Sequence, residues 1–495
     1  MNKFRKFVEN FLRDKNNLMF LGVLLVAFVI RLYYFVYTNG QTLWWDESEY
    51  MSMAKNIFYG IPYEFNPQRP ILFPLLIGFF LLMGENFVKF FISFLPSIGV
   101  VILTYLLGKE IYNKKIGLIA SFIMSVFWIS IFNATRIHAD TLALLFSLLG
   151  IYFFWKGYIS NKSEKLLSLG FLFMSLGFMI KVNAALAPLI IFVFVVITEK
   201  LDFLKQKILW KSVVWFFIPL IPYFIYNYVK FGTIFSFISG YVDPNSLASK
   251  FQSSFNWSIF GFTYDFTNTL FFILFLIGIL FVLLNIIMGF DLIYKEKNLK
   301  VKADLLSILS ILIVICWFVF IERWSAEPRW LILMAPFMFL VIGRGILDSF
   351  NYIKINGRIV FFIIIILLFL GSYSQLKYND ELIKSKKDSY IPVSMAGLWI
   401  GENSNKNDLI LSKSVPQITY YSGRETLGIP FREPEKIKEL KPKYMMVSVF
   451  ELHPPELLQF VDNIQDHLEI VNAYFADSKG TQPMLIIYKF KDYDF

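Results

Sequence analysis

The chain has 495 residues, of which 57% are hydrophobic and 17% charged, and its mean hydropathy is +0.58. A composition this apolar excludes an ordinary soluble domain and places the chain in a bilayer. The single cysteine, Cys316, excludes a disulfide framework and a cysteine-based metal site. The net charge of +10 would suit nucleic acid, but in a membrane protein a basic excess more often marks cytoplasmic loops, so we expect no nucleic acid partner.

Apolar runs of about 20 residues, the length that crosses the hydrocarbon layer as a helix, predict an α-helical polytopic membrane domain over residues 1–375. The first run is longer than a signal-peptide core and no small-residue cleavage site follows it, so we expect it to be retained. About eleven runs occur along the chain, at 18–38, 87–108, 116–134, 139–155, 166–181, 183–198, 212–229, 266–290, 304–321, 329–347 and 358–374.

Lysine and arginine gather in alternate loops, which predicts that these loops are cytoplasmic. The first basic cluster precedes the first run, and Arg344 is counted in the last cluster. We therefore expect a multi-pass protein of the cell membrane with a cytoplasmic N-terminus. An odd number of crossings then puts the loops at 39–86 and 230–265, and everything after about residue 376, on the extracytoplasmic side.

The segment 376–495 differs from the rest because it is charged and rich in turn residues. Short β-prone runs at 408–413, 444–450 and 484–490 alternate with helical stretches near 393–402 and 454–467. A length of roughly 120 residues is enough for a core of its own. The pattern predicts a small C-terminal extracytoplasmic α/β domain.

An acidic pair follows the first apolar run, in the segment Trp-Trp-Asp-Glu-Ser-Glu-Tyr at 44–50. Interface anchoring explains Trp44 and Trp45 without any function. Asp46 could be a helix N-cap with Glu49 at the N3 position. Alternatively, Asp46 and Glu47 could bind a polar substrate and take a proton from a hydroxyl at the membrane boundary.

The same loop continues through Tyr63 to Arg69 and Pro70 and then into an apolar run over 71–83. That run is too short to span comfortably, so it predicts a re-entrant or interfacial helix. Arg69 would then lie beside Asp46 and could bind a phosphate through its planar guanidinium. The alternative is an arginine that snorkels at the start of a helix.

A second polar cluster, Arg136, His138 and Asp140, lies between the third and fourth runs. Asp140 could simply cap the helix that it opens, and Arg136 and Asp140 would share one face if the turn between them were helical. Ionisable residues at membrane depth are costly and indicate function. One histidine with scattered acids is weak evidence for a metal. Lys181 interrupts the apolar sequence nearby, either as a functional cation or as a snorkelling lysine.

A short outer loop at 322–329 is dense in charges of both signs, including Arg323, Glu327 and Arg329. The two arginines oppose the positive-inside trend. This loop therefore indicates an anionic ligand on the outer side.

Taken in order, these residues resemble the multispanning polyprenyl-phosphate-sugar glycosyltransferases of the GT-C fold, in particular the branch with the protein O-mannosyltransferases and the lipid A aminoarabinose transferases. The resemblance covers residues 17–375 and depends on the order and sidedness of short motifs. These motifs are Arg31, Asp46-Glu47, Arg69-Pro70, Arg136 to Asp140, Lys181 and Pro328 to Leu331. A Trp-Trp-Asp string also marks oligosaccharyltransferases, but in a C-terminal domain, so we expect transfer of a single sugar.

The resemblance implies a membrane glycosyltransferase with a polyprenyl (dolichyl or undecaprenyl) phosphate sugar donor, a protein, lipid or glycan acceptor, and membrane lipids as surroundings. Asp46 would be the general base, with Glu47 either orienting the acceptor or tuning its neighbour Asp46. Inversion at the sugar carbon follows from direct displacement. No cofactor is required, although a divalent metal could bind. Arg69, Lys181 and Arg329 would bind the donor phosphate, and the wall around the substrate would be Tyr63, Arg136, His138, Asp140 and Glu327.

The competing class is a transporter or flippase of a lipid-linked or anionic substrate. Such a protein would also place charges inside the membrane, but it often shows internal symmetry, which this sequence lacks. It also gives no reason for acids clustered on one side of the membrane.

Overall fold

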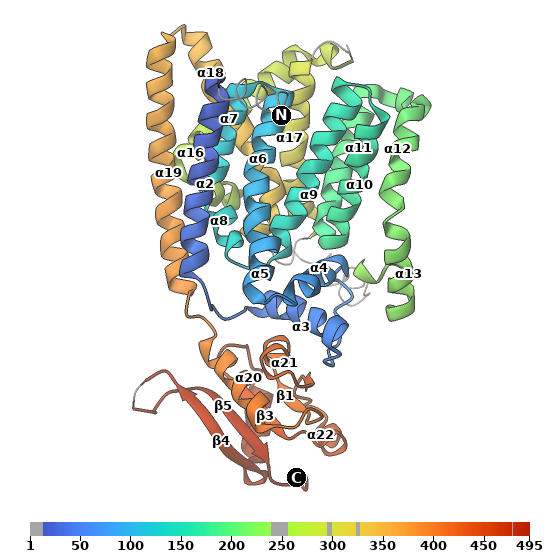
Figure 1. The fold of residues 1–495 in the computed structure, drawn as a ribbon, viewed down its shortest axis with the longest axis vertical. Coiled ribbons are helices and arrows are strands. Elements are labelled where there is room, and N and C mark those ends of the chain that lie inside the picture. Colours follow the sequence, from blue (N-terminus) through green and yellow to red (C-terminus); the bar gives the residue numbers. More distant parts are fainter. Residues whose placement is uncertain (1–12, 239–255, 295–298, 323–326, 478) are drawn as a thin grey trace, which may run out of the picture. The chain divides into compact units, whose positions relative to one another are not determined.

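The computed structural model describes residues 13–238, 256–294, 299–322, 327–477 and 479–495, and the chain divides into two compact units (Figure 1). The first unit comprises Met1–Tyr37, Pro67–Phe73 and Asn86–Ile383. The second comprises Thr38–Asn66, Pro74–Glu85 and Lys384–Phe495. The loop after the first long helix thus belongs mostly with the C-terminal residues rather than with the helices that flank it in sequence.

The first unit is a bundle of long apolar helices. Among the described residues, nine helices are long and apolar enough to cross a membrane, or ten if a pair bent by 55° is one span. This agrees with the multi-pass prediction. Its elements are α2 (Lys15–Tyr37), α5 (Glu85–Lys89), η1 (Phe90–Phe94), α6 (Leu95–Ile111), α7 (Lys114–Val126), α8 (Trp128–Ala134), α9 (Ala139–Phe154), η2 (Trp155–Ser160), α10 (Glu164–Ile180), η3 (Val182–Ala185), α11 (Leu186–Glu199), η4 (Lys200–Lys205), α12 (Lys207–Phe217), α13 (Leu220–Phe231), η5 (Ser236–Ile238), α16 (Ile259–Met288), η6 (Phe290–Tyr294), α17 (Leu299–Cys316), η7 (Trp317–Ile321), η8 (Pro328–Met334), α18 (Ala335–Ile353) and α19 (Gly357–Lys386).

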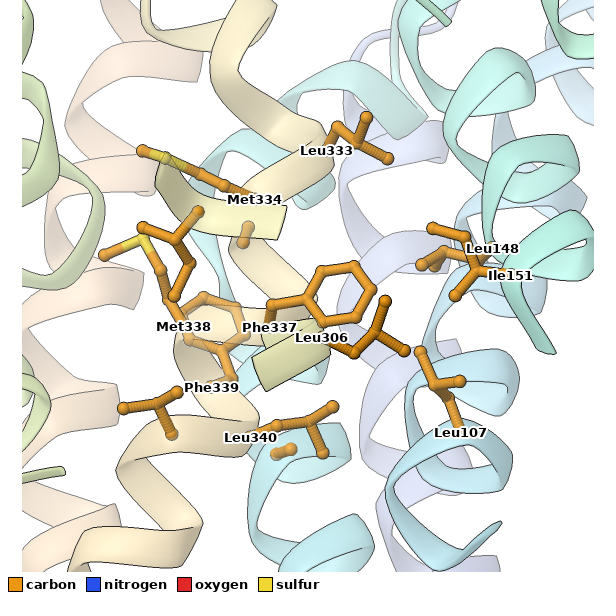
Figure 2. Packing of buried hydrophobic residues seen from close by; sticks show 14 of the residues in the cluster. Leu107, Leu148, Ile151, Leu306, Leu333, Met334, Phe337, Met338, Phe339 and Leu340 are labelled. Atoms are coloured by element: carbon orange, nitrogen blue, oxygen red, sulfur yellow. The ribbon is translucent and has the colours of Figure 1, made fainter. Parts of the chain in front are cut away.

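The core of this bundle is built around α18, because its first three turns are buried on every side. Figure 2 shows Phe337 and Leu340 of α18 packed among leucines of α6, α9 and α17. Two glycines let α18 approach α16 closely. A Cβ on Gly278 would lie 2.2 Å from the carbonyl oxygen of Val341, and one on Gly345 would lie 2.5 Å from the Cα of Gly278. Small residues at such crossings are the usual way in which membrane helices pack.

Buried polar side chains hold the bends of the bundle. Arg31 of α2 is fully buried and donates to the hydroxyls of Ser97 at 3.0 Å and Ser130 at 2.8 Å. The helix breaks between α7 and α8, and there the amide of Trp128 donates to Oε1 of Gln375 at 3.1 Å. Buried backbone groups freed by a break need such partners, since no water reaches them in a bilayer.

The second unit combines an α/β domain with the first loop. Its five-stranded sheet has the order β2-β1-β3-β5-β4, with β1 parallel to β2 and β3, and β5 antiparallel to β3 and β4. The strands predicted at 408–413, 444–450 and 484–490 form β1, β3 and β5. Its elements are α3 (Trp45–Tyr59), α4 (Leu72–Leu81), α20 (Ile391–Asn403), β1 (Ile410–Ser412), α21 (Val415–Ser422), β2 (Thr426–Leu427), α22 (Pro434–Leu440), β3 (Tyr444–Ser448), α23 (Pro455–Asn463), η9 (Gln465–His467), β4 (Leu468–Phe475) and β5 (Pro483–Phe490).

Helix α3 packs on α21 within this unit. The hydroxyl of Ser52 donates to the carbonyl of Pro416 at 2.9 Å, and Nζ of Lys55 donates to the carbonyl of Tyr420 at 2.6 Å. The backbone amide of Leu43, just before α3, donates to the Tyr421 hydroxyl at 2.9 Å. Residues that lie more than 350 positions apart in sequence therefore fix the position of α3.

Candidate active site

The acidic pair lies in the first turn of α3. Glu47 is buried, and its Oε2 accepts the amide of Trp44 at 2.7 Å. The helix therefore begins after Trp44 with Glu47 at N3, and the alternative of an Asp46 cap with Glu49 at N3 is wrong. Asp46 is partly exposed beside it. A helix N-terminus favours negative charge, so this turn suits an ionised carboxylate.

The rest of the first loop supports α3 and leads into α4. Glu49 is buried, and its Oε1 accepts the side-chain amide of Asn66 at 2.9 Å. Tyr63 lies between them in sequence, in a stretch without regular structure, and is partly exposed. Arg69 is also partly exposed, just before α4, and it belongs to the first unit whereas Asp46 belongs to the second. The expected neighbourhood of Asp46 and Arg69 thus remains a prediction.

Within the first unit, Asp140 and Lys181 form an ion pair whose carboxylate is buried. Nζ of Lys181 lies 2.5 Å from Oδ1 of Asp140, and their side chains are 17% and 4% exposed. Asp140 stands in the first turn of α9, and Lys181 occupies the break between α10 and η3 with extended backbone. Because α9 and α10 pack side by side, their ends bring the two residues together. The structure thus pairs two residues that the sequence indicated separately.

A second cation joins this pair. Arg329, in the first turn of η8, lies close enough to Asp140 to interact with it electrostatically, and its Nε is 2.6 Å from Oε2 of Glu327. Asp140, Lys181 and Trp330 line a cavity of about 30 Å³. A space of this size holds a water molecule or two rather than a sugar. Two cations of the predicted phosphate site, Lys181 and Arg329, therefore do lie around one carboxylate. Arg323 is outside the described residues.

The segment between α8 and α9 carries Arg136 and His138, which are both buried. It is not helical, because α8 ends at Ala134 and His138 has extended backbone. Arg136 and Asp140 therefore do not share a helical face, since that arrangement would need a helical turn between them. The Nδ1 of His138 lies 3.3 Å from Oδ1 of Asn133, and the Arg136 guanidinium lies 5.9 Å from the centre of the Phe132 ring. Both side chains pack on α8.

No group of three or more His, Cys, Asp or Glu side chains suited to a metal ion occurs within the described ranges. His138 also interacts electrostatically with Asp140. These two residues alone are too few for a typical protein metal site.

Other buried charges were not among the predicted site residues. Glu322 is buried, and its Oε2 accepts the indole N–H of Trp317 at 3.1 Å. Arg344, which the sequence placed among loop cations, is instead buried in α18, where its Nε lies 3.4 Å from Oδ1 of the fully buried Asp304. Arg344 also pairs with Asp348, and the spacing of four residues in sequence was the available signal for this second ion pair only.

Two groups at the contact of α3 with α21 have shifted pKa values. Burial lowers the pKa of Lys55, although the nearby Glu85 carboxylate works in the opposite direction. Burial also raises the pKa of Tyr420 well above its usual value, with a further contribution from Glu85, which accepts the Tyr420 hydroxyl at 3.1 Å. These groups serve packing, since Lys55 lies 3.9 Å above the Tyr420 ring.

The arrangement of the helices defines a class of fold. Helices of the bundle carry charged residues at their ends, a helix after the first span carries an acidic pair, and an α/β domain follows the last span. This is the GT-C fold, as comparison with solved structures shows. The structure of ArnT from Cupriavidus metallidurans in the apo state superimposes with a TM-score of 0.65 over 95% of this chain and 97% of that one, at 12% identity.

Two further structures were solved with lipid phosphates. ArnT from the same organism bound to undecaprenyl phosphate matches with a TM-score of 0.63 over 95% and 97% of the two chains, at 12% identity. The archaeal oligosaccharyltransferase AglB from Archaeoglobus fulgidus, in complex with an inhibitory peptide and a dolichol-phosphate, matches with a TM-score of 0.58 over 96% and 74%, at 12% identity.

The sequence itself matches one family over part of its length. Residues 68–226 match the dolichyl-phosphate-mannose-protein mannosyltransferase family. This stretch contains Arg69, Asp140 and Lys181 but neither Asp46 nor Arg329. No curated protein matches the chain.

Proposed function

We propose that this chain is an integral membrane glycosyltransferase. It moves a single sugar from a polyprenyl (dolichyl or undecaprenyl) phosphate to an acceptor hydroxyl on the extracytoplasmic side, with inversion. The observation that carries the proposal is the pair Asp140–Lys181 with Arg329 beside it, at one end of a bundle with the GT-C fold. Cations held at the end of a membrane helix bundle suit a lipid phosphate, whose charge must lie at the membrane boundary.

In this proposal Lys181 and Arg329 bind the phosphate of the donor, and Arg69 assists them. Their charge favours the leaving lipid phosphate, on which negative charge grows in the transition state. Asp140 orients the ammonium of Lys181, which is 2.5 Å away. His138, Arg136 and Glu327 form the polar wall around these groups. The support from known proteins is that structures with this fold were solved with undecaprenyl phosphate and with a dolichol-phosphate.

Asp46 is the general base of the proposed reaction. Its carboxylate takes the proton of the acceptor hydroxyl while the oxygen attacks the sugar carbon, the bond from that carbon to the phosphate oxygen breaks, and the lipid phosphate leaves with the electron pair. Glu47 holds the first turn of α3 through the Trp44 amide, so it positions Asp46 rather than the acceptor. Tyr63 contributes to acceptor binding.

The test uses the purified full chain with radiolabelled polyprenyl-phosphate sugars and a membrane extract as acceptor source. We expect Asp46→Asn to lower transfer about 10²–10⁴-fold, because general base catalysis contributes that much. The matched control is Glu64→Gln, an exposed acid of the same loop that has no proposed role. Unchanged transfer by Asp46→Asn would remove the base assignment.

The same assay separates an enzyme from a transporter. A wild-type protein that consumed no donor with any lipid-linked sugar, yet moved a fluorescent lipid phosphate across liposomes, would favour the transporter class. Adding EDTA tests the cofactor: we expect transfer to continue, and a loss restored by one divalent cation would show that the reaction needs a metal.

A further inference from the structure

The first unit has a large polar cavity at the end of the bundle where α6 ends and α7 and α17 begin. Its volume is about 820 Å³. The charged residues of its lining are Glu110, Lys114, Lys115, Lys300, Arg344 and Asp348, four cations and two anions, so the lining carries a formal charge of 4 − 2 = +2. This excess of positive charge suits an anionic ligand.

The cations of this cavity are not equivalent. Arg344 and Asp348 form an ion pair in its floor, and Lys300 lies 3.9 Å from the same carboxylate. Lys114 lies 2.5 Å from Asp14. Lys115 is exposed in the first turn of α7, where the side chain of Asn113 accepts its backbone amide at 2.9 Å. Lys115 is therefore the cation at the rim with most freedom to meet a ligand.

An apolar groove of about 560 Å³ adjoins this cavity along α2, α7 and α19. Met19, Val26, Phe122 and Phe369 are among the side chains that line it. Asn16, Lys115 and Leu347 line both the groove and the polar cavity, so the two spaces lie next to each other. A ligand that fills both must have a charged head and an apolar chain.

This end of the bundle is distinct from the proposed donor site. Helix α7 begins at Lys114 beside the polar cavity and runs, through α8, to the end of the bundle where α9 begins with Asp140 (Figure 1). The ion pair Asp140–Lys181 therefore lies at the opposite end of the first unit. A lipid at the cavity cannot be the donor in its reacting position.

We infer that these two adjoining spaces bind an anionic phospholipid of the surrounding bilayer, with its phosphate at Lys115 and Lys114 and one acyl chain in the groove. The basic loops, including the one with Lys114 and Lys115, are predicted to be cytoplasmic. Basic pockets between membrane helices on that side bind the headgroups of anionic lipids, and anionic phospholipids are abundant in the cytoplasmic leaflet. The inference goes beyond the proposed function, because it concerns a lipid that takes no part in sugar transfer.

The experiment is a titration of the delipidated full chain in detergent with phosphatidylglycerol, followed by native mass spectrometry. We expect Lys115→Ala to weaken binding about fivefold, the usual effect of one lysine near a lipid surface. The control is Lys207→Ala, an exposed lysine in the first turn of α12 outside the cavity. Equal binding by the wild type and Lys115→Ala would overturn the assignment of the headgroup.

A second variant tests the groove without changing any charge. Gly22 lines the groove and has open space around its Cβ position, so Gly22→Phe should fill the groove and weaken phosphatidylglycerol binding at least as much. Gly261, on α16, also has open space around it, and Gly261→Phe should bind normally. Normal binding by Gly22→Phe would show that the acyl chain lies elsewhere and would overturn the inference.

The identity of the ligand is tested with three competitors. Phosphatidylcholine should not displace phosphatidylglycerol, because its headgroup has no net charge. Inorganic phosphate at the same concentration should not displace it either, and displacement would indicate a site for a free anion. Stronger binding of undecaprenyl phosphate than of phosphatidylglycerol would assign the site to a carrier lipid instead.

Discussion

Two ion pairs of the first unit, Asp140–Lys181 and Asp304–Arg344, have different surroundings. Asp304 is fully buried and its oxygens accept the Tyr112 hydroxyl at 2.8 Å, the Asn285 amide at 2.6 Å and Nε of Arg344 at 3.4 Å. Asp140 has Lys181 as its hydrogen-bond partner among the described residues, a cavity beside it and Arg329 nearby.

The difference separates a structural ion pair from the one that we propose to lie at the donor phosphate. A buried carboxylate whose oxygens are satisfied from several helices holds those helices together and has no capacity for a ligand. Asp140 has fewer partners and a second cation nearby, so this ion pair can exchange some of its interactions for those of an anion. Arg344 also borders a cavity, but it is held by both Asp304 and Asp348. The number of partners that each carboxylate has therefore distinguishes the two pairs better than burial alone.

The largest expected effect is on transfer by Lys181→Ala. We expect the rate to fall about 10²–10³-fold, because a positioned donor is lost from the charge that develops on the leaving phosphate. Initial rates at varied donor concentration measure this. Lys211→Ala, which changes a lysine that is 66% exposed on α12, is the control. A variant as active as the control would place the phosphate elsewhere.

The structural ion pair should respond in stability. We expect Asp304→Ala to lower the free energy of unfolding by about 3–5 kcal/mol, since it leaves the guanidinium of Arg344 buried with fewer partners. Thermal unfolding in detergent micelles measures the change. Asp202→Ala breaks an exposed pair with Lys205 and should cost less than about 1 kcal/mol. Similar melting of both variants would contradict a structural role for Asp304.

A smaller effect is expected for one hydrogen bond of the same network. Tyr112→Phe removes the donor to Asp304 and should cost about 1 kcal/mol. Tyr105, in the same region of α6, is the matched control, because its hydroxyl is buried without a hydrogen-bond partner in the described part of the chain. Tyr105→Phe should therefore be neutral or slightly stabilising in the same unfolding experiment. If both variants lost the same stability, the hydroxyl of Tyr112 would have no special role.

The smallest effect concerns Asp408 and Lys443 of the second unit, a partly exposed pair whose charges lie 2.8 Å apart. Burial alone would raise the pKa of Asp408, but the bonds from Lys443 and from the Asn405 amide hold this pKa below its usual value. The lowered pKa means that the stabilisation is present above about pH 4 and is lost as the pH falls through the folded-state pKa.

Asp408→Asn should therefore destabilise the protein at pH 7 by less than about 1 kcal/mol. It should have little effect at a pH below the folded-state pKa of Asp408. The measurement is the difference in melting temperature between the wild type and the variant, taken from pH 7 down to a pH below that pKa. A difference that grew on acidification would have the wrong sign for this pair.

The membrane helices could be predicted from the sequence because about 20 apolar residues in a row have few other uses. The start of α3 could not be predicted, because tryptophan is not a favoured N-cap. Only the contact of Glu47 with the Trp44 amide identifies where the helix begins. Asp140 and Lys181 were both indicated as ionisable residues at membrane depth. Their pairing could not be predicted, because it depends on how α9 and α10 pack.

The ion pair Asp304–Arg344 was missed for a related reason. Arg344 lies near the end of an apolar run, where lysine and arginine usually mark a loop. Only the packing of α17 against α18 shows that it is buried. Short strands such as β2, with two residues, leave no periodic signal in the sequence at all.

The packing of α3 on α21 has a consequence for biosynthesis. The helix that carries Asp46 leaves the ribosome more than 350 residues before its partners Pro416 and Tyr420. The nascent chain must therefore hold α3 without its final contacts until those residues have been made. A polypeptide released by a stop codon before residue 415 would still contain the helices of the first unit but would lack the residues that Ser52 and Lys55 of α3 contact.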